Sequence, residues 1–189
     1  MGENKMTSEK ERRTLSILVE NRPGVLSIIA RLFSRNGFNI ESFCAGATAD
    51  PHLTRITIEV TADDNHTNLL VAQLNKMIPV YSAKTLDKEK TIRREFVLFK
   101  CSATTSEKRN EIIQIGNIFR ASVIDISKET LTLSVIGDET KIDGIRDMLE
   151  PFGILELART GILAVERGKY TIDEESKDSK EFDYGKNLE

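Results

Sequence analysis

The chain contains 189 residues, of which 39% are hydrophobic, and it has a formal net charge of −3 at pH 7. This length suits one large or two small domains, and the slightly acidic balance argues against a nucleic-acid-binding protein, which needs a basic face. No apolar run is long enough to span a membrane, and residues 1–13 are too polar for a secretory signal, so we expect a cytoplasmic protein.

Few residues are available for metal, disulfide or catalytic chemistry. Cys44 and Cys101 are far apart in the sequence, which predicts two reduced core thiols, and His52 and His66 are the only histidines. The sequence contains no glycine-rich phosphate loop, no nucleophile beside a base and no carboxylate cluster with metal spacing. We therefore expect no catalytic residue, no metal site and no cofactor in this chain.

The first half is predicted to have the element order βαββαβ. Four strands are expected, at residues 14–20, 39–44, 54–61 and 80–86; the first is an apolar run, and the third alternates apolar with polar residues. A first helix is expected at residues 24–36, with Pro23 suited to the first helical position. A second helix is expected after the caps Asp63–Asn65, with one apolar side made of Leu69, Leu70, Leu74 and Met77. Right-handed crossovers then give a four-stranded antiparallel sheet with both helices on one face.

The same pattern returns in the second half. Strands and helices are expected at residues 95–102, 106–119, 123–127, 130–136, 138–150 and 155–159, with an extended piece at 163–165. The fold class is therefore α+β, with two tandem ferredoxin-like βαββαβ domains. We expect a flexible arm at residues 1–13, domains at 14–87 and 95–168, a linker at 88–94 and a disordered tail at 169–189.

The two halves align at an offset of 86 residues, which places Phe33 on Phe119. At this offset Asn21 falls on Glu107 and Gly24 falls on Asn110. The second half therefore lacks the Pro-Gly turn and carries a carboxylate, which would repel an anionic ligand. We interpret the chain as one effector-binding half and one half that is structural or binds a partner.

The turn between the first strand and the first helix is the best candidate for a binding site. Gly24 has no Cβ, so a ligand can approach its backbone closely. The first N–H groups of the following helix have no internal partner and can bind a carboxylate. Asn21 adds a side chain that donates and accepts hydrogen bonds, as an amino-acid zwitterion requires. On local physics alone, however, a strand, a Pro-Gly pair and a helix are more often just a capped turn.

Longer stretches of sequence resemble a known family. The stretches Glu20–Leu26, Gly37–Ser42 and Leu53–Thr57 resemble the ACT domain of the small, regulatory subunit of acetolactate synthase (acetohydroxyacid synthase). Pro151–Gly153 and Ala158–Gly161 are similar to the C-terminal domain of the same family. The resemblance covers residues 13–168, and the tail that follows is longer than the family usually needs.

This resemblance implies that the chain performs no chemistry itself. The family's partner is a separate catalytic large subunit that holds thiamine diphosphate, Mg²⁺ and FAD and makes acetolactate in branched-chain amino-acid biosynthesis. The small subunit is expected to activate it and to confer feedback inhibition by a branched-chain amino acid, usually valine. Valine, leucine and isoleucine stay open as effectors, because one methylene is discriminated only modestly in an apolar pocket.

The resemblance also implies which residues bind the effector. Two ACT domains are expected to pair into one continuous sheet, as a homodimer with the effector between them. One protomer would supply Asn21 and the backbone of Gly24, Val25 and Leu26, and the other would supply Asn39 and Ile40. Arg55 and Arg159 are candidates for contact with the large subunit. The alternative for Arg55 is a solvated strand position, and the alternatives for Arg159 are strand stabilisation or a rim salt bridge.

Two other function classes are compatible with this fold. One is a free-standing tandem-ACT sensor that regulates transcription or another enzyme, although no helix-turn-helix stretch is found for direct DNA reading. The other is an enzyme built on a ferredoxin-like scaffold, since the fold alone does not fix the function. Neither alternative predicts activation of a thiamine-diphosphate synthase.

Overall fold

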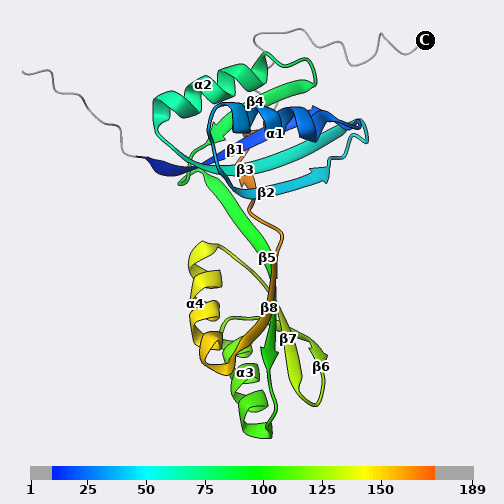
Figure 1. The fold of residues 1–189 in the computed structure, drawn as a ribbon, viewed down its shortest axis with the longest axis vertical. Coiled ribbons are helices and arrows are strands. Elements are labelled where there is room, and N and C mark those ends of the chain that lie inside the picture. The colour runs from blue at the N-terminus through cyan, green and yellow to red at the C-terminus, as the bar shows by residue number, and fades with distance from the viewer. Residues whose placement is uncertain (1–9, 173–189) are drawn as a thin grey trace, which may run out of the picture. The chain divides into compact units, whose positions relative to one another are not determined.

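The computed structural model describes residues 10–172 and divides the chain into two compact units. Among these residues, the first unit contains residues 10–92 and 164–172, and the second contains Arg93–Leu163. Each unit has the element order βαββαβ, which confirms the predicted tandem ferredoxin-like fold (Figure 1). No helix within residues 10–172 is long and apolar enough to cross a membrane.

The first unit is a four-stranded antiparallel sheet with two helices on one face (Figure 1). Its elements are β1 (Glu11–Glu20), α1 (Val25–Arg35), β2 (Ile40–Ala47), β3 (Leu53–Ala62), α2 (Asp64–Asn75) and β4 (Val80–Leu86). The strand order is β2-β3-β1-β4, so β1 and β3 are central. The core lies between the sheet and the helices, where Ile17 and Ile58 pack in one cluster with Ile29, Phe33 and Leu70.

The two helices of this unit begin and end at residues whose chemistry explains the boundaries. Gly24 precedes α1 with a φ of 89°, and Gly37 follows it with a φ of 72°. Both are left-handed conformations that glycine adopts without a steric cost. Asp63 caps α2 as predicted, because its carboxylate accepts the backbone N–H of His66 at 2.9 Å, and this hydrogen bond lowers the pKa of the Asp63 carboxyl.

Strand β1 is buried on both of its faces. Leu15, Ile17 and Val19 face the helices and belong to the main core. Thr14, Ser16 and Leu18 point to the opposite face, yet each is at most 3% exposed. The near-continuous apolar run in β1 is therefore explained by a cover on the second face of the sheet.

A segment from the C-terminal part of the chain contacts this second face. Residues Ala164–Ile172, here called the returning segment, belong to the first unit although they follow the second unit in sequence. Ile172 forms a small apolar cluster with Leu18 and Leu53. The Ser82 hydroxyl donates to the carbonyl oxygen of Ile172 at 2.8 Å. The returning segment thus contacts both β1 and β4.

The second unit repeats the plan, and one further strand joins its sheet. Its elements are β5 (Thr91–Ser102), α3 (Ser106–Ile118), β6 (Ser122–Ile126), β7 (Thr130–Gly137), α4 (Glu139–Leu149), the 3₁₀ turn η1 (Glu150–Phe152) and β8 (Ile154–Arg159). The further strand, β9 (Leu163–Glu166), belongs to the returning segment from Ala164 onward. The strand order is β6-β7-β5-β8, and β9 also pairs with β5. Its core is a separate cluster that includes Phe99, Leu133 and Ile145.

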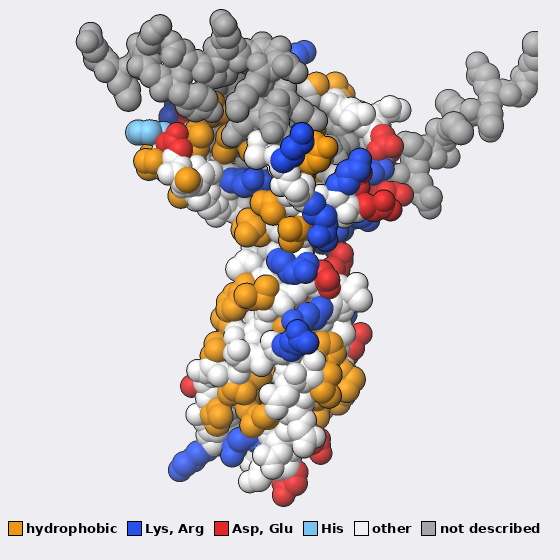
Figure 2. Space-filling model, turned by 180° about the vertical axis from the view of Figure 1, so that it is seen from behind, with side chains coloured by type: hydrophobic (Ala, Val, Ile, Leu, Met, Phe, Trp, Pro, Cys, Tyr) orange, Lys and Arg blue, Asp and Glu red, His pale blue; other side chains and the backbone are white. Residues whose placement is uncertain are grey.

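The face of this second sheet that points away from its core carries exposed apolar side chains (Figure 2). Phe96 and Ile136 are paired in register between β5 and β7, and they are 39% and 60% exposed. Their neighbours Val97 and Val135 point to the other side of the sheet and are buried. The alternation is that of a strand with one core face, but the outer face is mixed, because Lys100, Thr132 and Ser134 lie on it beside the apolar residues.

The domain boundaries expected from the sequence differ from the structure at three points. Strand β1 begins at Glu11 rather than at Thr14, and β5 begins at Thr91, inside the predicted linker. The returning segment packs with the first unit, whereas residues up to 168 were expected in the second domain and residues from 169 onward in a disordered tail. The remainder of the predicted arm and tail, residues 1–9 and 173–189, lies outside the described residues.

Smaller expectations also need correction. Pro23 lies in the turn before α1 rather than at its first position, and Leu69 is 55% exposed rather than buried with Leu70. The offset of 86 residues does not hold for the first helices, because α3 begins 81 residues after α1 (106 − 25) and ends 83 residues after it (118 − 35). Glu107 therefore lies inside the first turn of α3. The second unit still lacks a glycine before its first helix.

Candidate functional site

The Pro-Gly turn (Asn21–Gly24) is fixed by hydrogen bonds to a neighbouring loop. The Asn21 backbone N–H donates to the carbonyl oxygen of His52 at 2.7 Å, and its side-chain Nδ2 donates to the carbonyl oxygen of Pro51 at 2.9 Å. Asn21 itself is exposed. Its amide oxygen faces no hydrogen-bond donor within residues 10–172 and can accept from a ligand.

Gly24 leaves the backbone at the start of α1 accessible. A Cβ placed on Gly24 would meet no atom within 4 Å, so the space beside this residue is open. The first helical bond runs from the N–H of Ile28 to the carbonyl oxygen of Gly24 at 3.1 Å. The N–H groups of Val25 and Leu26 precede this bond, at the positive end of the helix dipole, and the Val25 N–H makes a long hydrogen bond of 3.5 Å to the carbonyl oxygen of Arg22.

The two apolar residues of the predicted site have different surroundings. Val25 is 2% exposed and packs in the main core, so only its backbone is available to a ligand. Leu26 is 46% exposed and presents its side chain beside the turn. The wall that an aliphatic ligand would contact is therefore Leu26 rather than Val25.

The remaining two predicted residues lie at the other end of the sheet. Asn39 is exposed and donates from Nδ2 to Glu41 Oε1 at 3.1 Å, and Ile40 is half-buried against the core. Ile40 pairs with Val60 of β3, which pairs with Arg13 of β1, whereas Asn21 follows the opposite end of β1. Asn21 follows Arg13 by eight residues (21 − 13), which is about 26 Å at the rise of a strand. One chain therefore does not bring the two groups together.

Both arginines predicted to contact a partner make contacts inside their own unit. The Arg55 Nη2 donates to the carbonyl oxygen of Ala164 at 3.0 Å, which holds the returning segment against β3. Arg159 forms two hydrogen bonds with the Glu95 carboxylate, one of them from Nε to Oε2 at 3.0 Å. The Glu95 carboxylate raises the pKa of Arg159. Glu95 is 3% exposed, so this ion pair satisfies a buried charge.

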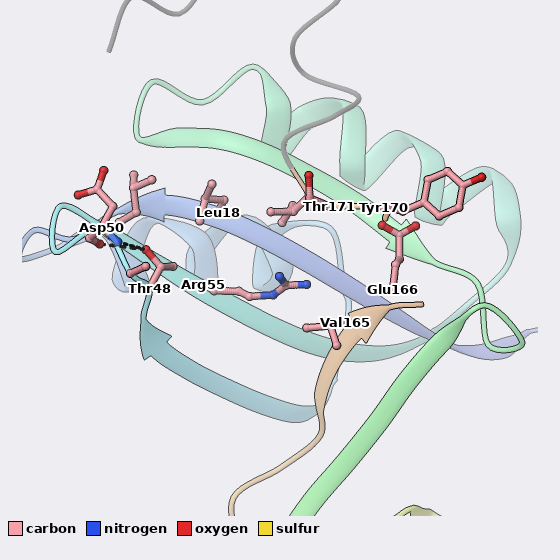
Figure 3. Close-up of a pocket in the computed structure, with 11 residues that line it drawn as sticks. Leu18, Thr48, Asp50, Arg55, Val165, Glu166, Tyr170 and Thr171 are labelled. Atoms are coloured by element: carbon pink, nitrogen blue, oxygen red, sulfur yellow. Dashed lines mark hydrogen bonds between the residues drawn. The ribbon is translucent and has the colours of Figure 1, made fainter. Parts of the chain in front are cut away.

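A cavity of about 530 Å³ lies in the first unit, between β1, β3, the loop at residues 48–50 and the returning segment (Figure 3). Its charged lining residues are Asp50, Arg55 and Glu166, and its apolar wall includes Leu18 and Val165. Several of these groups are already engaged: Arg55 bonds Ala164, and Glu166 pairs with Lys84. The cavity therefore forms where the returning segment is attached to the sheet.

Sequence reasoning missed Lys84 and Glu166, which attach the returning segment. Lys84 has an exposed side-chain fraction of only 9%, forms an ion pair with Glu166 and donates to the carbonyl oxygen of Thr171 at 2.8 Å. A lysine in a strand is normally taken as solvent-facing. The sequence feature that could have indicated the returning segment is the extended apolar piece at 163–165. It follows the strand that completes the second βαββαβ pattern, so that pattern does not need it.

The two cysteines differ in exposure, which predicts different reactivities. Cys101 is fully buried and burial raises its pKa to about 11, so at pH 8 it stays a protonated, unreactive thiol. Cys44 is half-buried in the edge strand β2. We expect Ellman's reagent to modify about one thiol per native chain and the second only after unfolding. The Cys44→Ser variant should show no fast reaction, and fast modification of that variant would contradict the assignment.

Comparison with known proteins gives the same family for both units. A model described as "AHAS small subunit-like ACT domain" matches residues 15–82, and one described as "Small subunit of acetolactate synthase" matches residues 94–168. A probable acetolactate synthase small subunit from Methanothermobacter thermautotrophicus is 43% identical over 87% of this chain and 98% of its own length. The acetolactate synthase small subunit of Mycobacterium bovis is 44% identical over 82% of this chain and 92% of its own length.

A solved structure agrees in fold over nearly the whole described chain. The crystal structure of the acetolactate synthase small subunit from Thermotoga maritima superimposes with a TM-score of 0.78 at 34% identity. It covers 85% of this chain and 99% of the other. Two matched domains, two relatives of similar length and one solved structure agree, so this chain belongs to the acetolactate synthase small-subunit family and its first unit is an ACT domain.

Proposed function

We propose that this chain binds a separate catalytic large subunit of acetolactate synthase, raises its activity and makes it sensitive to a branched-chain amino acid. Membership in the small-subunit family supports the association and the regulatory role. The large subunit would hold the thiamine diphosphate, Mg²⁺ and FAD, and this chain would contribute no catalytic residue. Valine is the effector that we would test first.

The Pro-Gly turn is the observation that carries the effector part of this proposal. The effector's carboxylate would bind the first N–H groups of α1 beside Gly24, where the backbone is open. Its ammonium group would donate to the Asn21 amide oxygen, and its aliphatic side chain would lie against Leu26. Each group of a small apolar amino acid then has a partner of the matching chemistry.

The distance between Asn21 and the pair Asn39 and Ile40 within one chain supports a binding site formed by two copies of the chain. Asn39 and Ile40 lie about 26 Å from Asn21 along β1, so they can close an effector site only if a second chain supplies them. A two-fold homodimer would form two such sites, each with the Pro-Gly turn from one chain and Asn39 from the other. An effector bound between copies can favour one arrangement of the dimer, and a coupling of about 1–3 kcal/mol gives clear inhibition.

The decisive experiment is acetolactate formation by the cognate large subunit, with and without this chain, across a valine titration. We expect activation together with new sensitivity to valine. Activation without valine sensitivity would keep the association with the large subunit but contradict the effector assignment. No change in activity, in a complex shown to form, would contradict the regulatory role and favour a free-standing amino-acid sensor.

Asn39→His should weaken valine binding about tenfold while the fold stays intact, because the amide is lost and a larger ring occupies the proposed site. Asn39 is exposed and makes one side-chain hydrogen bond, to Glu41, within residues 10–172. Isothermal titration calorimetry of the full chain measures the affinity, and thermal unfolding checks the fold. Asn110→His, an equally exposed asparagine on α3, is the matched control and should bind valine normally. Normal valine binding by the Asn39 variant would remove this residue from the site.

A further inference from the structure

A groove runs between α1 and α2 on the ACT domain, apart from the Pro-Gly turn. It has a volume of about 300 Å³. It is lined by Ile28, Arg31, Leu32 and Arg35 of α1, by Gln73 of α2, and by Lys76 and Met77, which follow the end of α2. The four α1 residues recur at three- and four-residue steps, so they form one stripe along the helix. The floor is apolar: Ile28 is 42% exposed and Leu32 is buried beneath it.

The groove is positively charged and uncompensated. Arg31, Arg35 and Lys76 are all exposed, and no acidic residue lines the groove. Within residues 10–172 these three cations have no ion pair or hydrogen bond from their side chains. Three like charges around an apolar floor repel one another and favour an occupant that is both apolar and anionic.

We propose that this groove binds the chain's own segment Glu181-Phe182-Asp183-Tyr184. In this segment an aromatic side chain is flanked on both sides by carboxylates, which matches an apolar floor with cations at its rim. The whole stretch of residues 173–189 contains seven acidic residues and three lysines. Its charge is therefore opposite to that of the groove, and it is attached to the same ACT domain.

The attachment point makes the contact geometrically possible. The described chain ends at Ile172, whose carbonyl oxygen accepts the Ser82 hydroxyl of β4. Strand β4 is an edge of the sheet, and α2 packs against it. The ten residues from Ile172 to Phe182 span up to about 35 Å when extended, compared with about 20 Å for a sheet and the helix layer on it. The tether also raises the local concentration of the segment to the order of millimolar.

A competition experiment on the full chain tests this proposal. A labelled peptide of residues 173–189 is titrated into a full-length variant with Phe182→Ser and Asp183→Lys, whose own segment no longer fits the groove. We expect the peptide to bind this variant at least tenfold more tightly than it binds the wild-type chain, because the wild-type segment occupies the groove. The binding should also weaken when the salt concentration rises from about 0.05 to 0.5 M.

Charge reversal identifies the surface. Arg31→Glu, Arg35→Glu and Lys76→Glu, added together to the same variant, should abolish peptide binding. A control with the same change in charge carries Lys88→Glu, Lys108→Glu and Lys128→Glu, all exposed and outside the groove, and should bind normally. Circular dichroism checks that every variant is folded. Equal affinity for variant and wild-type chains, no binding at all, or binding that survives the groove reversal would each overturn the proposal.

Discussion

Gly24→Asp is expected to abolish the response to valine, with affinity reduced by at least about 100-fold. The open space beside Gly24 accommodates the new side chain, so the fold should persist at a modest cost from the φ of 89°. The carboxylate of the variant would stand where the effector's carboxylate is proposed to bind. Two like charges about 4 Å apart repel by about 4 kcal/mol at an effective dielectric constant of 20, which exceeds the 2.7 kcal/mol of a 100-fold loss.

The neutral variant Gly24→Asn separates charge from shape. Asparagine has nearly the same volume as aspartate and tolerates a positive φ, but it carries no charge. We expect it to retain most of the valine affinity that Gly24→Asp loses, as measured by calorimetry and by inhibition of the complex. Equal losses in both variants would show that shape matters rather than charge, and would contradict the carboxylate placement.

Mixing two variants with impaired valine binding tests whether the site is shared between chains. A Gly24→Asp dimer and an Asn39→His dimer would each have two defective sites. In a mixed dimer both defects fall in one site and the other site is intact, because each site takes one residue from each chain. After exchange at equal concentrations, about a quarter of the wild-type sites should bind with wild-type affinity. No recovery, in a sample shown to contain mixed dimers, would place the whole site within one chain.

Arg159→Leu is expected to lower the free energy of unfolding of the second unit by about 2–3 kcal/mol. The Glu95 side chain is 1% exposed and would lose the guanidinium that neutralises it, leaving a buried charge unpaired. The loss should be smaller than for a fully buried pair, because Arg159 itself is 38% exposed. Urea unfolding followed by circular dichroism measures the change.

Two further variants control this prediction. Arg146→Leu removes an arginine that pairs with Asp143 and Asp147 on the surface of α4, and should leave the free energy of unfolding nearly unchanged, because both partners stay in water. Glu95→Gln combined with Arg159→Leu removes both charges and should recover part of the stability. If Arg159→Leu changed only binding of the large subunit and left unfolding unaltered, Arg159 would be a partner contact rather than a structural residue.

Local sequence determined most of the fold and the form of the Pro-Gly turn. Strand and helix positions follow from apolar periods of 2 and 3.6, which reflect the geometry of a single element and need no knowledge of its neighbours. Strand β4 was predicted at its observed bounds, and the Asp63 cap was also correct. Gly24 and Gly37 have the conformations that their positions at the ends of α1 require.

Long-range contacts decided the rest. Residue spacing indicated a site at the Pro-Gly turn, but only the strand register shows that Asn39 and Ile40 lie at the other end of the sheet. A lysine such as Lys84 is expected to face solvent from the sequence. It is buried because Glu166 and Thr171, which contact it, belong to a segment about 80 residues later in the chain. Arg159 has no partner in its own strand, and Glu95 reaches it only through the pairing of β5 with β8.

The sequence by itself determined the elements and their caps, since these depend on neighbours a few residues away. The tertiary structure decided which charges are paired and which faces are covered, since those depend on how distant strands align.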